Sequence, residues 1–286
     1  NIGFLYLPRI SERFKDDFIN KGQSHILQYN YQDRLIINMG YSYHYNSIGG
    51  AIINNTIASN SYSIRFNFES AGNIMYALSK ATNIRKNNDG EYAILGIPYA
   101  QYVKGEFDFS KNIRIDHRNS FAFHIGMGIA VPYGNAKTIP FEKQYFSGGA
   151  NSVRGWTVRD LGPGSFVRDE NTNLLDQSGD IKLDASIEYR SKLFWKFQGA
   201  IFVDAGNIWT IRDYDNQPGG VFKFDKQIAV AYGLGLRLDL DFFILRFDGG
   251  MKALNPVYEK GKDRYPIIHP KFSRDFAFHF AVGYPF

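Results

Sequence analysis

One glycine-rich segment concentrates the residue types that could position or pair a charged group. It reads FSGGANSVRGWTVRDLGPGSF over residues 146–166 and lies between segments that alternate like β-strands. Arg154 stands between Val153 and Gly155, and Trp156 follows. A guanidinium carries five donors in a fixed fork that matches carboxylates. The segment therefore offers an ion-pairing group, although an arginine in an ordinary surface loop would simply be solvated.

The other chemical groups in the sequence do not form a recognisable site. The acidic stretches 169–180 and 213–220 lack the full ligand pattern of a calcium loop. Asp239 and Asp248 could mimic a pair of hydrolase carboxylates, but charged residues are normal on strands that face a wet lumen. No nucleophile elbow and no complete dinucleotide fingerprint occur. No metal-ligand spacing relates the six histidines, which are His25, His44, His117, His124, His269 and His279. We therefore expect no enzymatic activity, no cofactor and no metal, and the lack of a basic aromatic groove predicts no nucleic-acid partner.

Composition favours a membrane β-barrel. The 286 residues include no cysteine, which fits an envelope location, and no run of 18 apolar residues that would predict a transmembrane helix. Mean hydropathy is low at -0.31, yet 16% of residues are aromatic. A barrel reconciles these values because only every second residue of a strand faces lipid and aromatic girdles mark both interfaces. The net charge of +5 is typical of a solvated loop surface. Attraction to anionic lipid head groups is the alternative interpretation of this charge.

Alternation with a period of two is the strongest structural signal. It recurs in 34–45, 121–131, 228–241 and 276–286, with one apolar or aromatic face and one small or polar face. These segments run to ten or more residues, whereas soluble strands have about five or six and tilted membrane-spanning strands about 9–11. A soluble β-sandwich is the alternative, but the small polar face suits a lumen better than a packed core. The predicted fold class is all-β, a transmembrane antiparallel β-barrel.

About eleven strands are predicted from this pattern. Their ranges are 2–8, 24–32, 34–46, 61–70, 98–110, 118–131, 179–191, 197–206, 227–240, 242–252 and 275–286. Long joints at 71–97, 132–178, 207–226 and 253–274 alternate with short ones, as expected for loops on one side of a membrane and turns on the other. The joint 71–97 is predicted to hold a short helix. An odd count conflicts with the even number of strands in bacterial barrels, so either the count is off or strands precede Asn1.

The loop motif and three later segments of the sequence resemble a known family. VRGW at 153–156, preceded by PFEKQYFSGGANS and followed by VRDLGPGS, is similar to the signature loop of the BamA/TamA superfamily of outer-membrane assembly barrels. The match continues in GDIKLDASIEYR (179–190), GAIFVDAGNIW (199–209) and FHFAVGYPF (278–286). The wording is closest to the lipidated TamA-like (TamL) proteins of Bacteroidetes, with BamA of that phylum as a near alternative.

The resemblance implies a domain organisation. The family barrel has sixteen strands, and its signature loop lies between the eleventh and the twelfth. Five predicted strands follow the loop here, as the family requires. Residues 1–286 are therefore expected to be the C-terminal portion of a barrel domain, with the first five strands and the periplasmic POTRA domains upstream of Asn1. The start at Asn1, without a leader pattern, agrees with a mature chain or a fragment.

The resemblance also implies a site. In the family the signature loop folds back into the barrel lumen, where a guanidinium needs carboxylate partners. Arg154 matches the family's arginine, and Glu188 and Asp204 stand where the family's acids stand. Alternation directs both acids inward, so we expect Glu188, Asp204 or both to hold Arg154. The remaining loop residues are expected to allow close backbone approach or to pack the tip: Gly148, Gly149, Val153, Gly155 and Trp156.

The last residues resemble the assembly signal of outer-membrane proteins. The signal would run from His279 through Tyr284 to Phe286, although Ala281 replaces its glycine. Pro285 cannot donate a ladder hydrogen bond, and Gly283 adds flexibility. In the family the last strand pairs poorly with the first and this seam opens laterally. A proline that merely ends a strand is the alternative interpretation.

The expected function is that of an outer-membrane assembly factor in the bacterial cell outer membrane. It would insert and fold β-barrel proteins, or translocate surface proteins, through the seam between first and last strands without ATP. A two-partner-secretion-type transporter is the alternative, and a passive porin is a further one. The implied partners are outer-membrane lipid and lipopolysaccharide, unfolded outer-membrane protein substrates, and accessory periplasmic or lipoprotein subunits.

Overall fold

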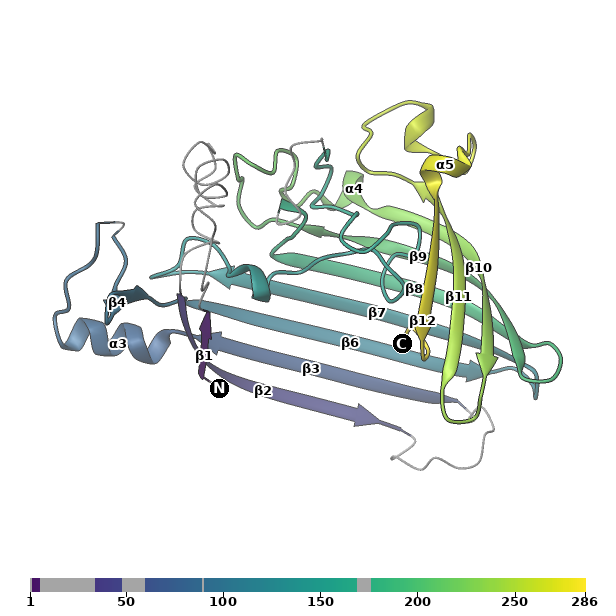
Figure 1. The fold of residues 1–286 in the computed structure, drawn as a ribbon, viewed down its shortest axis with the longest axis horizontal. Helices are drawn as coiled ribbons and strands as arrows, with labels where there is room; N and C mark the ends of the chain where they lie inside the picture. Colours follow the sequence, from purple (N-terminus) through teal and green to yellow (C-terminus); the bar gives the residue numbers. More distant parts are fainter. Residues whose placement is uncertain (1, 6–33, 48–59, 89, 169–175) are drawn as a thin grey trace. The chain divides into compact units, whose positions relative to one another are not determined.

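Antiparallel strands dominate the computed structural model, which describes residues 2–5, 34–47, 60–88, 90–168 and 176–286 (Figure 1). The strands are β1 (Ile2–Leu5), β2 (Arg34–Asn46), β3 (Ser61–Ala71), β4 (Ala93–Ile94), β5 (Ile97–Pro98), β6 (Tyr102–Arg114), β7 (Asn119–Pro132), β8 (Ile181–Lys192), β9 (Phe197–Trp209), β10 (Ala229–Asp239), β11 (Ile244–Leu254) and β12 (Phe276–Val282). The helices are α3 (Asn73–Ala81), α4 (Phe224–Gln227) and α5 (Phe272–Asp275), with short 3-10 turns at Phe141–Lys143 and Lys262–Arg264. In the described part of the chain, ten strands form one sheet in the order β1-β2-β3-β6-β7-β8-β9-β10-β11-β12, while β4 pairs with β5.

The sheet confirms the all-β antiparallel fold predicted from alternation. Every predicted strand segment contains a strand except 24–32, which lies outside the described residues. The sheet strands from β2 to β11 have 11 to 14 residues, the length that a membrane-spanning strand needs. The helix expected within 71–97 is α3.

Several predicted strand boundaries differ from the structure by two to four residues, and two of the differences have a clear structural reason. The strand expected to start at residue 98 starts at Tyr102, because Ile97–Pro98 forms the short β5 and pairs with β4 instead. The last strand was expected to reach Phe286, but β12 ends at Val282. Gly283 donates the final bond to the Ile244 carbonyl and then takes a left-handed φ of 89°, which turns the chain out of the ladder.

The chain divides into two compact units, and the first comprises Asn1–Ser42, Asn67–Gly105 and Ile129–Gln144. Within its described part, Gly72 ends β3 with a left-handed φ of 76° and starts α3. A Cβ atom on Gly72 would lie 2.2 Å from the Ala100 carbonyl oxygen, so only glycine allows this approach. The Asn135 side chain bonds the backbone of Tyr92 and Tyr99 and so ties the long joint together.

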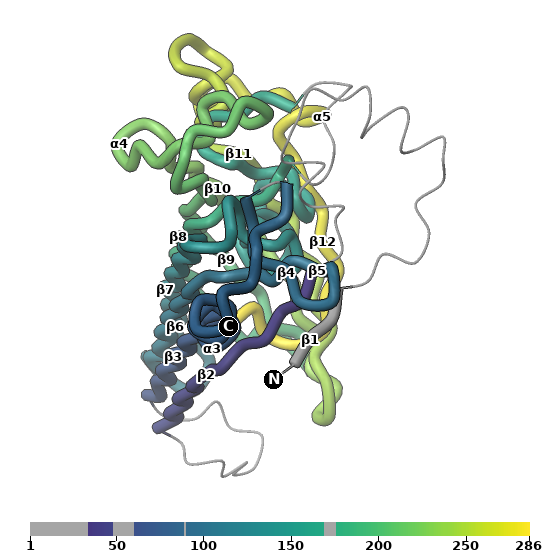
Figure 2. The backbone as a smooth tube through the Cα atoms, turned by 90° about the vertical axis from the view of Figure 1, so that its left-hand side faces the viewer, coloured from purple at the N-terminus to yellow at the C-terminus, as the bar shows by residue number. Residues whose placement is uncertain are grey.

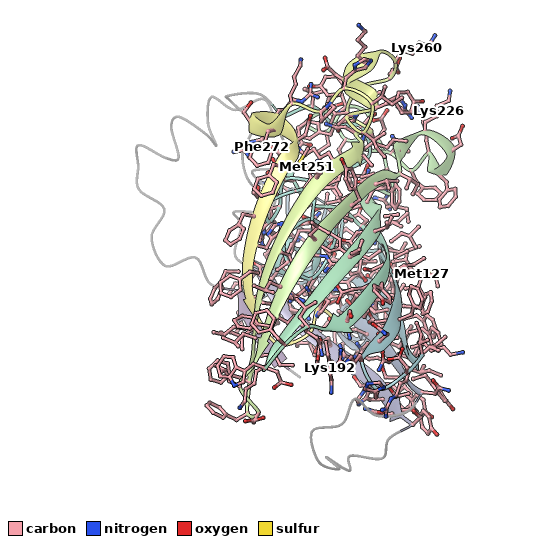
Figure 3. All side chains as sticks on the ribbon, turned by 90° about the vertical axis from the view of Figure 1, so that its right-hand side faces the viewer. Met127, Lys192, Lys226, Met251, Lys260 and Phe272 are labelled. Carbon is pink, nitrogen blue, oxygen red and sulfur yellow. The ribbon has the colours of Figure 1, made fainter. Side chains whose placement is uncertain are left out.

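The second unit comprises Tyr43–Phe66, Glu106–Gly128 and Tyr145–Phe286 and contains strands β8 to β12. Its strands bury polar side chains and expose apolar ones. On β9, Asp204 is 1% exposed, whereas Ile201 is 57% exposed. This inverts the pattern of a soluble sheet and is typical of a strand with lipid on one side and a polar interior on the other. Figure 3 shows aromatic side chains projecting from the outer surface of β12.

Short turns and long joints leave opposite ends of the strands. Between β6 and β7, the Asp116 carboxylate closes a tight turn by accepting bonds from the backbone N–H groups of Arg118 and Asn119 and from the Asn119 side chain. The Asn119 side-chain bond, followed by the Arg118 backbone bond, lowers the pKa of Asp116 below its ordinary value. The joints that contain α4 and α5 lie together at one end of β10 to β12 (Figure 2). None of the helices in the described residues is long and apolar enough to cross a bilayer.

Candidate functional site

Two adjacent glycines fold the signature loop back on itself. Gly148 and Gly149 each have a φ of 92°, a conformation that other residues rarely adopt. A Cβ atom on Gly148 would lie 2.2 Å from the Thr157 carbonyl oxygen. Gly149 donates a backbone bond to Trp156, which closes the loop. The segment that carries Arg154 is therefore a compact hairpin-like tip.

The tip is packed against the inner face of β10. Val153 and Trp156 are buried with Leu161, Ala229 and Ala231 in one apolar cluster. Small residues at positions 229 and 231 leave room for the indole ring, which explains why this strand alternates alanine with large outward side chains. The packing fixes the depth at which the intervening Arg154 enters the sheet's concave side.

The loop backbone lies in direct contact with the strands at two glycines. A Cβ atom on Gly155 would lie 2.8 Å from the Ala231 Cβ. A Cβ atom on Gly250 of β11 would lie 2.0 Å from the Arg154 carbonyl oxygen. Gly250 was not among the predicted site residues. Its signal in the sequence is a glycine in the interior of a strand, which often marks close approach by another backbone.

Replacing Gly250 by alanine is expected to lower the free energy of unfolding by about 1–3 kcal/mol, because backbone atoms must shift to admit the methyl group. Urea unfolding of the full-length protein in detergent micelles would measure this, together with trypsin digestion of the loop. Gly105→Ala is the matched control, since a Cβ atom there meets nothing within 4 Å. Equal unfolding midpoints for the two variants would contradict the contact.

Arg154 is held by both acids that were considered for it. Its Nε and Nη2 atoms donate to the two carboxylate oxygens of Asp204 over 2.8 Å each, a bidentate geometry. Its Nη1 donates to Glu188 over 2.6 Å. The guanidinium also lies 3.5 Å from the centre of the Phe202 ring. Arg154 and Asp204 are 1% exposed and Glu188 is fully buried, so the group is removed from bulk solvent.

The two acids belong to a larger network of alternating charges. Glu188 also accepts bonds from Arg190 over 2.6 Å and from Arg237 over 2.8 Å. Asp248 on β11 lies 3.0 Å from Arg237 and 3.5 Å from Arg154. The network contains four guanidiniums and three carboxylates, with one excess positive charge: Arg154, Arg190, Arg237, Arg246, Glu188, Asp204 and Asp248.

Register explains why these side chains meet. Ser186 pairs with Asp204 across β8 and β9, and its hydroxyl donates to the Asp204 carboxylate over 2.6 Å. Asp204 pairs in turn with Ala231 on β10, whose small side chain leaves the carboxylate accessible to the loop. The alternation in the sequence predicts that both acids lie on the inward face, but it does not predict Asp248, Arg237 and Arg246 as further members of the network. Alternation gives the face of a side chain but not its neighbour across the sheet.

The predicted C-terminal residues fall into two groups. His279 on β12 points to the loop, and its Nε2 lies 3.0 Å from the Arg154 carbonyl oxygen. Tyr284 and Phe286 lie beyond the end of β12, together with Pro285. The Tyr284 hydroxyl donates to Gln198 over 3.2 Å, and the Phe286 ring stacks on His124 at 5.1 Å. β12 pairs with β11, and no other described strand pairs with it.

Metal binding was not expected from the histidine spacing. In the described ranges no cluster of three or more histidine or acidic side chains is placed to hold a metal ion. His25 lies outside the described residues. The carboxylates of the buried network each face at least one guanidinium, so they act as ion-pair partners in this arrangement.

The sequence profile of the Omp85 superfamily domain matches residues 29–286. The chain belongs to the Omp85 superfamily. Outer membrane protein assembly factor BamA of Neisseria meningitidis serogroup B is 35% identical over 175 residues, which are 56% of this chain and 21% of that protein. The chain therefore spans about a fifth of the length of this relative.

Two solved structures resemble the chain. BamA from Haemophilus ducreyi lacking POTRA domains 1-3 has a TM-score of 0.46 at 16% identity, over 89% of this chain and 55% of that one. CdiB from Acinetobacter baumannii has a TM-score of 0.33 at 13% identity, over 86% and 42%. The chain spans about half of each of these solved chains.

Family membership and the sheet together give the class and location of this Omp85 chain. Omp85 proteins are outer-membrane β-barrels of bacteria, so the long antiparallel sheet is a barrel wall and the protein is an outer-membrane protein. The predicted BamA/TamA superfamily is confirmed. The narrower resemblance to the TamL proteins or BamA of Bacteroidetes stays a prediction.

Proposed function

We propose that this Omp85 chain is part of an outer-membrane assembly factor that inserts and folds β-barrel proteins. Its clients would be unfolded outer-membrane proteins, and lipid, lipopolysaccharide and accessory periplasmic or lipoprotein subunits would be its partners. The supporting observation is β12, whose second edge pairs with no strand in the described part of the chain. A free strand edge is a template for another strand, so a client strand would add there.

The buried network would keep the wall in place while the edge exchanges partners. His279 attaches β12 to the Arg154 backbone, and Arg154 attaches the loop to β8 and β9. Beyond Val282 the ladder ends, so pairing weakens toward Pro285. The unpaired N–H and C=O groups of this edge would drive addition of a client strand, so the step would need no ATP. The short final strand would also favour local thinning of the bilayer.

A crosslinking experiment tests the edge directly, because residues 1–286 contain no cysteine that would compete with an introduced one. The test variant is Phe278→Cys on β12, and the control variant is Ile201→Cys on the interior strand β9. The two parent side chains are similarly exposed, at 60% and 57%. In the full-length protein, a stalled client barrel with cysteines in its strands should form disulfides with position 278 and not with position 201. Equal crosslinking at both positions would contradict the proposal that client strands add at the free edge of β12.

Depletion in cells distinguishes the alternatives. Depletion of an assembly factor should reduce the amounts of many other surface barrels. Depletion of a two-partner-secretion-type transporter should leave those barrels unchanged and abolish export of one protein. Depletion of a porin should change conductance alone. A quantitative census of surface proteins before and after depletion therefore decides among the three functions.

A further inference from the structure

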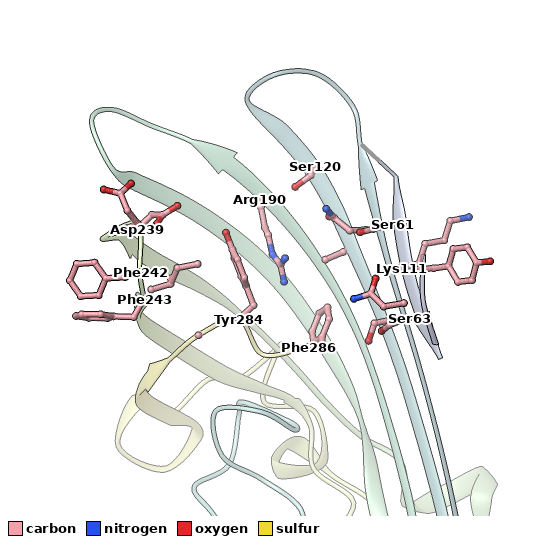
Figure 4. Close-up of a pocket in the computed structure, with 18 residues that line it drawn as sticks. Ser61, Ser63, Lys111, Ser120, Arg190, Asp239, Phe242, Phe243, Tyr284 and Phe286 are labelled. Atoms are coloured by element: carbon pink, nitrogen blue, oxygen red, sulfur yellow. Dashed lines mark hydrogen bonds between the residues drawn. The ribbon is translucent and has the colours of Figure 1, made fainter. Parts of the chain in front are cut away.

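A cavity of about 650 Å³ lies on the concave side of the second unit, away from the signature loop. Its wall is formed by small hydroxyl side chains of β3 and β6 on one side, and by β12's continuation on the other (Figure 4). The side chains that line this wall include Ser63, Asn112, Ser120, Arg190, Tyr284 and Phe286. Of these residues, only Arg190 is linked to Arg154, because both guanidiniums bond to Glu188.

One part of the cavity binds aromatic rings. The Arg190 guanidinium lies 4.4 Å from the centre of the Tyr284 ring and 5.4 Å from that of Phe286. Figure 4 shows Arg190 reaching between these two rings. His124 stacks on Phe286 with an angle of 14° between the ring planes. A cation and a flat ring placed around two aromatic side chains form a favourable aromatic-binding surface.

A second part of the cavity carries polar groups that have no hydrogen-bond partner within the described residues. They are the Ser120 hydroxyl, the Arg190 Nη2 and the Asn112 side-chain oxygen. Ser120 is 1% exposed and Arg190 is 7% exposed. Buried polar groups are almost always hydrogen-bonded, so these atoms point to a bound group. Two of them can donate and one can accept only, which matches the alternating C=O and N–H groups of an extended peptide.

We propose that this cavity is a binding site for an extended peptide with aromatic side chains, and that Tyr284 and Phe286 occupy its aromatic part in this structure. The segment 284–286 of the chain shows how such a peptide would bind. Its two rings are separated by one residue and contact Arg190 and His124. The identification of this peptide as a client strand rests on the proposed function. Binding of an aromatic peptide at the cavity does not depend on assembly activity.

Self-occupation predicts competition. A tethered segment competes at an effective concentration in the millimolar range, so an added peptide should bind the unaltered protein weakly. Removing both rings in the Tyr284→Ala/Phe286→Ala variant should free the site. The affinity for the added peptide should then rise by about tenfold or more.

The test uses full-length protein in which Ser63→Cys carries an environment-sensitive fluorophore. Residues 1–286 contain no cysteine, and any cysteine outside them is replaced by serine so that labelling is specific. The probe is the peptide Ala-Val-Gly-Tyr-Pro-Phe, and the control peptide has alanine at both aromatic positions. We expect saturable binding of the aromatic probe that is tighter in the Tyr284→Ala/Phe286→Ala variant. Equal binding of both peptides, no binding in either protein, or unchanged affinity in that variant would overturn the proposal.

A further substitution separates binding from folding. Ser120→Ala added to that variant removes one unpaired donor without touching the buried charge network. It should weaken probe binding by about twofold to tenfold, as expected for one hydrogen bond, while the urea unfolding midpoint stays the same. Unchanged probe affinity would contradict the peptide-backbone contact. If the probe binds as expected but depletion leaves other barrels unchanged, the proposed function fails and the binding site stands.

Discussion

Replacing Arg154 by alanine is expected to lower the free energy of unfolding by about 3–5 kcal/mol, the effect of removing one partner from a buried ion pair. Asp204 would lose both bonds of its bidentate pair, and Glu188 would lose its 2.6 Å bond. The measurement is urea unfolding of the full-length protein in detergent micelles. Trypsin should also cleave within 145–166 in the variant at a protein-to-protease ratio that leaves the parent intact.

Arg168→Ala is the matched control for this prediction. Arg168 lies near the same loop but is exposed, and its nearest carboxylate oxygen, on Asp160, is 3.7 Å away. An exposed pair contributes about 0–1 kcal/mol. If both variants unfold at the same urea concentration, the buried ion pairs of Arg154 do not stabilise the loop and the interpretation that they hold it in place fails.

Glu188→Gln is the second substitution with a large expected effect, again about 3–5 kcal/mol. The substitution keeps the shape but removes the carboxylate that Arg154, Arg190 and Arg237 share. The network would then hold two excess positive charges in place of one. The same unfolding assay measures the loss, with the exposed acid Glu142→Gln as the control.

A double substitution separates charge from shape. Glu188 is the carboxylate that bonds Arg190, so Glu188→Gln/Arg190→Gln restores the excess charge of the parent network. The double variant should therefore recover part of the stability that Glu188→Gln loses. The coupling energy, which is the effect of the double substitution minus the sum of the two single effects, should exceed the ~0.5 kcal/mol within which independent sites add. Simple addition of the two single effects would show that the charges at these positions do not interact.

The sequence was sufficient to predict the sheet, because membrane-facing and interior residues alternate over strands longer than those of soluble proteins. The residues 228–241 show this, with leucines outward and Ala231, Gly233 and Arg237 on the other face. The loop motif was sufficient to suggest Glu188 and Asp204 as partners of Arg154. Both contacts involve residues whose face follows from parity along a single strand.

The remaining features depend on relations between strands. Asp248 meets Arg237 and Arg246 because β10 and β11 pair in a register that sets Gly235 opposite Asp248 and Arg237 opposite Arg246. Gly250 receives the loop backbone because the tip is inserted to one particular depth. The departure of Tyr284 and Phe286 from β12 depends on Gly283, whose left-handed conformation cannot be distinguished in the sequence from an extended one.

The contacts of Arg154 join parts of the chain that are far apart in sequence. The bond from His279 spans 125 residues, and the bond to Asp248 spans 94. Such contacts form late in folding, because the entropy of closing long loops must be overcome first. Until β12 docks, the loop lacks the bond from His279 to the Arg154 backbone. Docking of β12 is therefore expected to lock a loop that lies 125 residues earlier in the sequence.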